Sequence, residues 1–337
     1  MLGVMWLHWA PSEWRGPFPF EIGLFFFLTL TGFLITRILL RERAAGEVTS
    51  QPWRVKAYTH FQKRRMVRIL VPCYAAMVFA LIVGAPDLRN HPLLYFFHLS
   101  NFHMAVLEKW PSGTAHYWTL ALQVQFYLLW PIIVFWTPRR GLKIIFLLCV
   151  AVAPLSRMVI PILYPQIHHH GVLPFVSCDY FAVGALLALA LERGMRVGDG
   201  SLKWASWLAF LGYVILYIYH ERGETIAGFW CIQQTLVSVV FIGLISATLA
   251  GFSGVLGRVL EHPSVQAIGR LSFGLYLFHT PVPLLLGHIF PFLWHPSIVG
   301  PWIIVRLLAF ALTSWGLAFV CWKYLESHGT LASHPLK

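Results

Sequence analysis

Charged residues are scarce in this sequence, and acidic residues are scarcer still. Only 11% of the 337 residues are charged, and 13 Asp and Glu stand against 25 Lys and Arg. Soluble globular domains are about 25% charged and about 45–50% apolar, whereas this chain is 58% hydrophobic. The composition therefore excludes a soluble enzyme, a disordered chain and a disulfide-stabilised scaffold. A polytopic membrane protein remains.

Cysteine is also rare, and the usual motifs of soluble enzymes are missing. The five cysteines stand singly in apolar runs and form no Cys-X-X-Cys pair, so we expect neither disulfides nor a cysteine metal centre. The chain has no dinucleotide-binding glycine motif, phosphate-binding loop, serine nucleophile elbow or zinc-protease motif. The run His168-His169-His170 has no carboxylate or cysteine partner at ligand spacing. We expect no metal site and no bound cofactor.

Long apolar runs are abundant instead. A membrane-spanning helix needs about 20 mainly apolar residues, and nine such runs occur, at 21–40, 66–84, 117–136, 142–161, 174–191, 203–220, 227–250, 267–290 and 300–324. The apolar piece at residues 1–10 is long enough for half a crossing only. We predict an all-α polytopic membrane protein of about ten transmembrane helices, the first of them truncated. Residues 1–337 would form a single integral membrane domain.

The positions of Lys and Arg predict the orientation. The segment between the first two full helices carries nine of them and is expected to be cytoplasmic. The loops with Arg139, Arg193 and Arg258 fall on the same side if residues 92–107 do not span. We expect that segment to be a re-entrant or surface helix on the outer side. Basic cytoplasmic loops then explain the net charge of +12, so the expected partners are membrane lipids and not nucleic acid.

Several polar side chains fall inside the apolar runs, where they are costly and usually face a partner or a cavity. They are His8, Gln123, Gln125, Arg157, Asp179, His279 and Arg306. Arg157 and Asp179 lie near the outer ends of neighbouring predicted crossings and could pair structurally. Neutral imidazole accepts a proton near physiological pH, so His8 and His279 are candidates for a general base. A purely structural role for each histidine is the alternative.

A basic cluster, KRRMVR at residues 63–68, lies at the predicted cytoplasmic mouth of a helix. Arg65 and Arg68 are three residues apart and share a helix face. Together with Arg64 they could contact anionic lipid. They could equally bind the phosphates of a nucleotide such as coenzyme A, because guanidinium groups match phosphate oxygens in pairs.

Four stretches resemble known sequence motifs and follow one another in the same order as those motifs: LFFFLTLTGFLIT (24–36), FQKRRMVRILVP (61–72), HYWTLALQVQFYLLWP (116–131) and IGRLSFGLYLFHTP (268–281). Together they resemble the motifs of the acyltransferase-3 family of integral membrane acyltransferases. That family includes bacterial O-antigen and exopolysaccharide O-acetyltransferases. Residues 323–326 also resemble the family's ending.

The resemblance implies an activity and roles for particular residues. Family members commonly take acetyl from cytoplasmic acetyl-CoA and pass it to a hydroxyl of a glycan or lipid-linked sugar outside the bacterial inner (plasma) membrane. His8 matches the family's first-helix histidine, the expected catalytic base, and His279 matches the histidine of the fourth motif. Arg65 and Arg68 match a pair implicated in acyl-CoA binding or in shaping the cytoplasmic mouth.

The third stretch is expected to contribute to the pocket. Trp118, Gln123 and Tyr127 could line it, with amide or hydroxyl donors stabilising a tetrahedral oxyanion. No Ser/His/Asp grouping is evident from spacing. We therefore favour direct attack by the acceptor hydroxyl over a covalent acyl-enzyme.

Two departures from the family pattern keep other functions open. Only seven residues precede His8, so the family's Arg or Lys eleven residues before this histidine has no counterpart, and we expect a truncated chain or a protein that does without the group. The family's Glu-Glu pair reads Gln123-Val124. A sugar or lipid transporter (flippase) without acyl chemistry, and a catalytically inactive scaffold on the same fold, are the alternatives.

Overall fold

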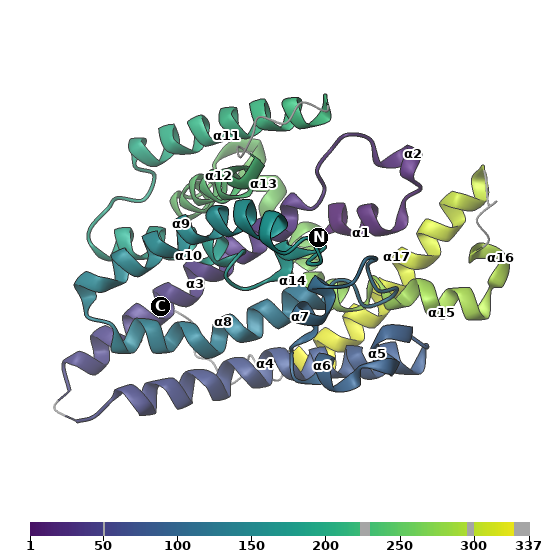
Figure 1. Ribbon diagram of the computed structural model, residues 1–337, viewed down its shortest axis with the longest axis horizontal. Helices are drawn as coiled ribbons and strands as arrows, with labels where there is room; N and C mark the ends of the chain where they lie inside the picture. Colours follow the sequence, from purple (N-terminus) through teal and green to yellow (C-terminus); the bar gives the residue numbers. More distant parts are fainter. Residues whose placement is uncertain (50, 223–229, 295–299, 327–337) are drawn as a thin grey trace.

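Helices make up nearly all of the regular structure. The computed structural model describes residues 1–49, 51–222, 230–294 and 300–326 (Figure 1), and the described chain is 80% helical with no strand. Seven described helices are long and apolar enough to cross a membrane. They are α3 (Ile22–Glu47), α4 (Arg54–Ile82), α8 (Tyr117–Trp136), α9 (Arg139–Leu163), α11 (Gly200–Glu221), α12 (Trp230–Ala250) and α17 (Pro301–Cys321). The predicted all-α polytopic fold is confirmed, whereas the count of ten crossings is not.

The remaining predicted crossings form shorter helices. The run at 174–191 gives α10 (Cys178–Glu192), and residues 1–10 give α1 (Leu2–Trp9). The run at 267–290 is split into α14 (Pro263–Phe278) and α15 (Pro281–Ile289). Pro281 has no amide hydrogen to donate to the preceding turn, and a new helix begins at this residue, which leaves His279 at the junction. Residues 227–229 of another predicted crossing lie outside the described residues.

The segment between α4 and α8 does not span, as predicted. It forms three helices of five or six residues, α5 (Pro86–Asn90), α6 (Pro92–Phe96) and α7 (Ser100–Ala105). The Tyr95 hydroxyl donates to Asp87 and lies 3.1 Å from the Thr114 hydroxyl oxygen. Burial, and then the hydrogen bond to Asp87, raise the pKa of Tyr95 well above its ordinary value. The phenol therefore stays a hydrogen-bond donor.

Five further short elements complete the described chain. They are α2 (Ser12–Arg15), α13 (Gly254–Glu261), α16 (Pro291–Trp294), the 3₁₀ turn η1 (His170–Val172) and the π-helical turn η2 (Trp322–Glu326).

Ion pairs join several helices at one end of the molecule. Glu47 at the end of α3 accepts from Arg43 (2.6 Å) and from Arg139 at the start of α9 (2.9 Å). Arg139 also bonds Glu192 at the end of α10 (2.7 Å). Arg43 donates to the carbonyl oxygens of residues 134 and 137 at the end of α8, both at 2.7 Å. The basic loops around residues 47, 139 and 193 thus share one end, as the predicted orientation requires.

The backbones of α3 and α10 approach closely through two glycines. A Cβ added at Gly184 would lie 2.1 Å from the carbonyl oxygen of Thr29. A Cβ added at Gly32 would lie 2.2 Å from the carbonyl oxygen of Phe181. Real Cβ atoms cannot come so near to backbone oxygen. Glycine at both positions therefore allows this helix pair to pack at its observed distance, as small residues do elsewhere in membrane bundles.

Arg157 of α9 and Asp179 of α10 form a buried ion pair, which confirms the predicted pairing. Two guanidinium nitrogens bond the two carboxylate oxygens, Nη1 to Oδ2 at 2.9 Å and Nη2 to Oδ1 at 2.6 Å. The side chains are 2% and 0% exposed. Thr235 of α12 donates to Asp179 Oδ2 at 2.6 Å, and the guanidinium lies over the Tyr180 ring. The pair therefore joins three helices.

Candidate active site

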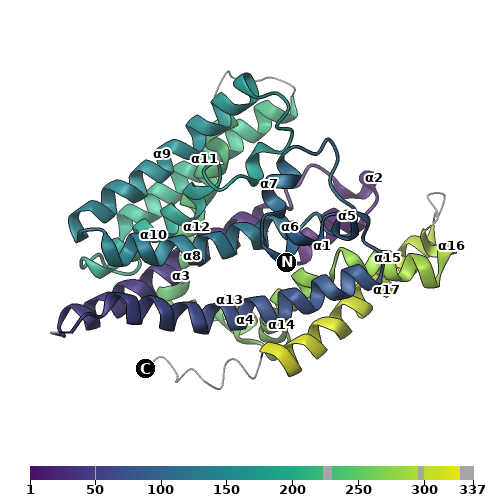
Figure 2. The ribbon, with the colours of Figure 1, turned by 60° about the horizontal axis from the view of Figure 1, so that its bottom comes forward.

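A pocket of about 690 Å³ opens where α1, the start of α3, residues 110–118 and the α14–α15 junction meet. Figure 2 shows α1 close to α14 and α15, and the Trp9 indole donates to the carbonyl oxygen of His279 at 2.8 Å. The polar lining includes His8, Arg15, Glu21, Ser112, His116, Tyr276 and Thr280. Since α3 and α8 begin here and end at the ion pairs around Glu47, the pocket lies at the opposite end of these helices.

The structure brings the two sequence-predicted histidines together. The His8 and His279 rings meet edge to face with centroids 5.1 Å apart. His279 is fully buried, and its Nδ1 lies 2.7 Å from the carbonyl oxygen of Tyr276. A carbonyl only accepts, so Nδ1 carries the hydrogen and Nε2 keeps its lone pair. That Nε2 is buried and finds no partner among the described residues.

A third histidine, His116, completes the cluster. Its ring lies 5.0 Å from that of His279, and its Nδ1 is 2.5 Å from the Thr280 hydroxyl. Thr280 donates its own hydrogen to the carbonyl oxygen of Gly113 (2.9 Å), so His116 Nδ1 is the donor. His116 Nε2, like that of His279, is buried without a partner in the described chain. The sequence signal was present, because His116 opens the third family-like stretch, yet sequence reasoning gave it no role.

The pocket also contains charged groups that sequence reasoning missed. Arg15 follows α1 in the short helix α2, and its Nε donates to the carbonyl oxygen of Ala10 at 3.0 Å. Glu21 precedes α3 and lines the same pocket. His8 itself is exposed to the open volume of the pocket. A ligand could therefore reach an imidazole and a guanidinium together.

The three predicted pocket residues of α8 divide into two groups. Trp118 lines the pocket, whereas Gln123 and Tyr127 lie deeper in the helix. Gln123 Nε2 donates to the Tyr127 hydroxyl at 3.0 Å and approaches the Thr31 hydroxyl of α3 at 3.5 Å. Gln123 Oε1 is buried without a partner among the described residues.

One face of α8 carries a row of polar side chains. His116, Thr119, Gln123 and Tyr127 are spaced by three, four and four residues, which is the spacing of one helix face. At 1.5 Å per residue this polar row is about 16 Å long. The Thr119 hydroxyl lies 2.5 Å from that of Tyr276. Polar groups therefore lead from the histidine cluster into the apolar interior.

The predicted arginines lie near the inner end of this polar row. Arg65 is partly buried and Arg68 is exposed, and both lie near Tyr127 at that end. Arg64 is exposed, and its Nη1 lies 3.4 Å from His60 Nε2. Because α4 begins at Arg54, the cluster lies well inside the helix and not at its start. Lys and Arg favour helices, so the helix extends through the basic segment.

Gln125 has a structural partner on a neighbouring element. Its Nε2 donates to the side-chain oxygen of Asn101 in α7 at 2.9 Å and to the carbonyl oxygen of His98 at 2.8 Å. This bonding attaches the short helices between α4 and α8 to the middle of α8. It accounts for one polar residue in an apolar run without any catalytic role.

The family model of the acyltransferase domain matches residues 1–321, and the chain belongs to this family. It is thus a membrane-embedded acyltransferase domain, as its motifs led us to expect. Its relatives include the peptidoglycan O-acetyltransferase OatA of Listeria monocytogenes, with 25% identity over 84% of this chain and 47% of the relative. The putative peptidoglycan O-acetyltransferase YrhL of Bacillus subtilis has 26% identity over 81% and 46%.

A third relative is more nearly equal in length. Nodulation protein 10 of Rhizobium leguminosarum bv. viciae has 26% identity over 93% of this chain and 86% of its own length. The chain spans about half the length of the two peptidoglycan-related proteins. No solved structure is significantly similar to it.

Proposed function

We propose that this chain is a membrane O-acyltransferase that moves an acyl group, acetyl from acetyl-CoA, to a hydroxyl of an extracytoplasmic glycan or lipid-linked saccharide. The observation that carries the proposal is the contact of His279 with both His8 and His116, two histidines that line a pocket of about 690 Å³. In two of these histidines, His116 and His279, Nε2 is buried and has no hydrogen-bond partner among the described residues. The printed names of the relatives, two of them peptidoglycan O-acetyltransferases, support a glycan acceptor.

The donor would approach from the end that carries the arginines. Arg65 and Arg68 offer guanidinium groups to the phosphates of an acyl-CoA, with exposed Arg64 beside them. The polar row on α8 then offers hydrogen-bonding groups to the amide-bearing arm that ends in the thioester. The thioester would reach the histidine cluster, where the pocket admits the acceptor from the opposite end.

The chemical step follows from the groups in the pocket. His8 removes the proton from the acceptor hydroxyl as its oxygen attacks the thioester carbonyl carbon. The new C–O bond forms, the C–S bond breaks, and the proton passes from His8 to the departing CoA sulfur. The Arg15 guanidinium lines the same pocket and is our candidate for stabilising the negative oxygen of the tetrahedral intermediate. His279 contacts His8 and would hold its ring in place.

The test is CoA release from acetyl-CoA by the purified chain in nanodiscs, with and without a peptidoglycan fragment as acceptor. Mass spectrometry of the fragment reports the ester formed. His8→Gln should lower acceptor-dependent release by at least about 100-fold, the contribution of a general base. The matched control is His288→Gln on α15, because His288 is exposed, lies outside the pocket lining and bonds a backbone carbonyl of its own helix. This control should retain full activity.

The same preparation separates the alternatives. A flippase would move labelled acceptor across a vesicle membrane without releasing CoA. An inactive scaffold would neither bind nor cleave acetyl-CoA while remaining folded. Either result, or a His8→Gln chain that releases CoA at the rate of the unmodified chain, contradicts the proposal.

A further inference from the structure

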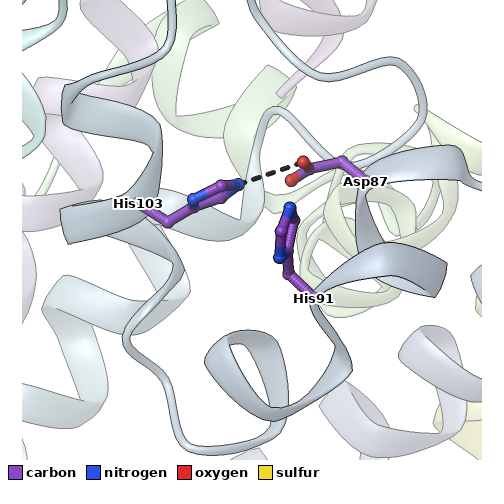
Figure 3. A group of neighbouring side chains, drawn as sticks. All are labelled: Asp87, His91 and His103. Atoms are coloured by element: carbon purple, nitrogen blue, oxygen red, sulfur yellow. Dashed lines mark hydrogen bonds and ion pairs between the residues drawn. The ribbon is translucent and has the colours of Figure 1, made fainter.

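Three side chains outside the pocket converge on the segment between α4 and α8. Figure 3 shows Asp87 from α5, His91 from the end of α5 and His103 from α7 turned toward one another. One ligand atom from each lies within 4.8 Å of those of the other two. We propose that Asp87, His91 and His103 form a binding site for one divalent ion of the zinc class.

The backbone places two of the ligands on one helix face. Asp87 and His91 are four residues apart, and the His91 amide donates to the Asp87 carbonyl oxygen at 2.9 Å, so the helical turn continues to His91. Residues four apart on a helix are neighbours, which is the spacing used by many paired metal ligands. A second element, α7, brings His103 to the same point.

The distances between these side chains suit a tetrahedral ion. His103 Nε2 lies 3.0 Å from Asp87 Oδ1, and the rings of His91 and His103 have centroids 4.5 Å apart at an interplanar angle of 54°. Two ligands each about 2.0–2.1 Å from a tetrahedral ion are themselves about 3.3 Å apart. The Asp87–His103 pair already has nearly this separation. Rotation of the His91 side chain would bring its nitrogen to a similar distance.

The surroundings support a metal ligand role for Asp87. Its second carboxylate oxygen accepts a hydrogen bond from the Tyr95 hydroxyl, which fixes the carboxylate orientation in the way that neighbouring groups orient ligands in metal sites. Two imidazoles and one carboxylate favour zinc over calcium or magnesium, which prefer all-oxygen sites. His91 is exposed while Asp87 and His103 are partly buried. An ion could thus enter from solvent and keep a water as its fourth ligand.

A bound ion would connect the short helices to the pocket. It would join α5 to α7, and Tyr95 links Asp87 to the Thr114 hydroxyl. Thr114 lies between Gly113 and Ala115, both of which line the pocket. The site is therefore a structural one that would stiffen one wall of the pocket. Without a metal, the Asp87–His103 contact would be a hydrogen bond between the two side chains.

The test measures metal binding directly and does not depend on acyl transfer. The full chain, purified in detergent without a histidine tag and treated with a chelator, is titrated with Zn²⁺ in competition with a chromophoric chelator. Co²⁺ is then added alone, because its visible absorption is intense in four-coordinate sites. We expect one ion per chain and an intense Co²⁺ band.

Two ligand variants and a control make the result decisive. His91→Gln changes an exposed side chain and should fold normally, so it guards against a folding defect in His103→Gln. Each should weaken Zn²⁺ binding by at least about 10-fold, the smallest typical loss when only a group that orients a ligand is removed, and should abolish the Co²⁺ band. His288→Gln should bind as the unmodified chain does. Absence of stoichiometric binding, or equal affinity in His91→Gln and the unmodified chain, would overturn the proposal.

Discussion

Removing either partner of the buried Arg157–Asp179 pair should destabilise the bundle, but by unequal amounts. Both side chains are almost fully enclosed, at 2% and 0% exposure. Breaking a buried pair from one side costs about 3–5 kcal/mol, because the remaining charge is left uncompensated. The two remaining charges have different chemistry. A carboxylic acid can take up a proton and become neutral, whereas a guanidinium stays charged at any pH used in practice.

The contacts that remain in each variant decide whether its loss lies near about 3 or near about 5 kcal/mol. In Arg157→Ala, Asp179 keeps the hydrogen bond from Thr235 and can become neutral by protonation, so we expect a loss of about 3 kcal/mol. In Asp179→Ala, Arg157 stays charged and keeps only the carbonyl oxygen of Cys231 at 3.2 Å, the Thr235 hydroxyl at 3.2 Å and the ring of Tyr180. We expect a loss of about 5 kcal/mol for this variant. A difference of 2 kcal/mol is about a 30-fold change in the unfolding equilibrium.

Reversible unfolding in mixed micelles, followed by tryptophan fluorescence, gives these free energies. The double variant Arg157→Met/Asp179→Leu replaces both charges with apolar groups and should be markedly more stable than Asp179→Ala. Equal losses for the two single variants at all pH values would refute this reasoning.

Three further changes test other parts of the structure. Gly184→Ala should prevent α3 and α10 from packing, because the added Cβ would lie 2.1 Å from a backbone oxygen. The control is Gly316→Ala, which should fold normally because Gly316 is exposed and its added Cβ would meet no neighbouring atom within 4 Å among the described residues. Size-exclusion profiles and helical circular dichroism compare the two variants. Gln123→Met removes a buried amide that is only partly hydrogen-bonded, so it should change the free energy of unfolding by less than about 1 kcal/mol. Acetyl-CoA turnover should fall at least about 10-fold, because the polar row loses its central hydrogen-bonding group. His116→Gln should lower turnover by about 100-fold with unchanged circular dichroism, because His116 contacts His279, which would hold the His8 ring in place, and a misplaced catalytic group costs about that much. Turnover equal to that of the unmodified chain in the Gln123 or the His116 variant would contradict the role given to that residue.

The helices were predictable because apolar composition over about 20 residues is a strong local signal. The run at 117–136 became α8 with the same bounds. The pairing of Arg157 with Asp179 was also predictable, because isolated charges in apolar runs require partners. The division at Pro281 was less evident from the sequence. Hydropathy is averaged over about 20 residues, and one proline, with its missing amide hydrogen, barely changes that average.

The site was predictable only where a motif marked a residue. His8 and His279 stood out as polar residues in apolar runs and matched family motifs, and the structure places their rings in contact. Their third neighbour, His116, is far from both in the sequence, so only the fold brings it near. The same holds for Asp87 and His103, which lie on separate short helices. Their side chains converge through the turns between α5 and α7, for which the sequence carries no periodic signal.

The polar row on α8 has a consequence for what must cross the bilayer under the proposed function. A coenzyme with several phosphates is too highly charged to pass through hydrocarbon, but a thioester arm held along this row would present only a small neutral group at the far end. The chain would then act as a vectorial catalyst, with its leaving group retained in one compartment and its ester made in the other. Its rate would saturate separately with the donor on one side of the membrane and with the acceptor on the other. Membrane carriers show the same kinetic pattern, although here no intact donor would cross the bilayer.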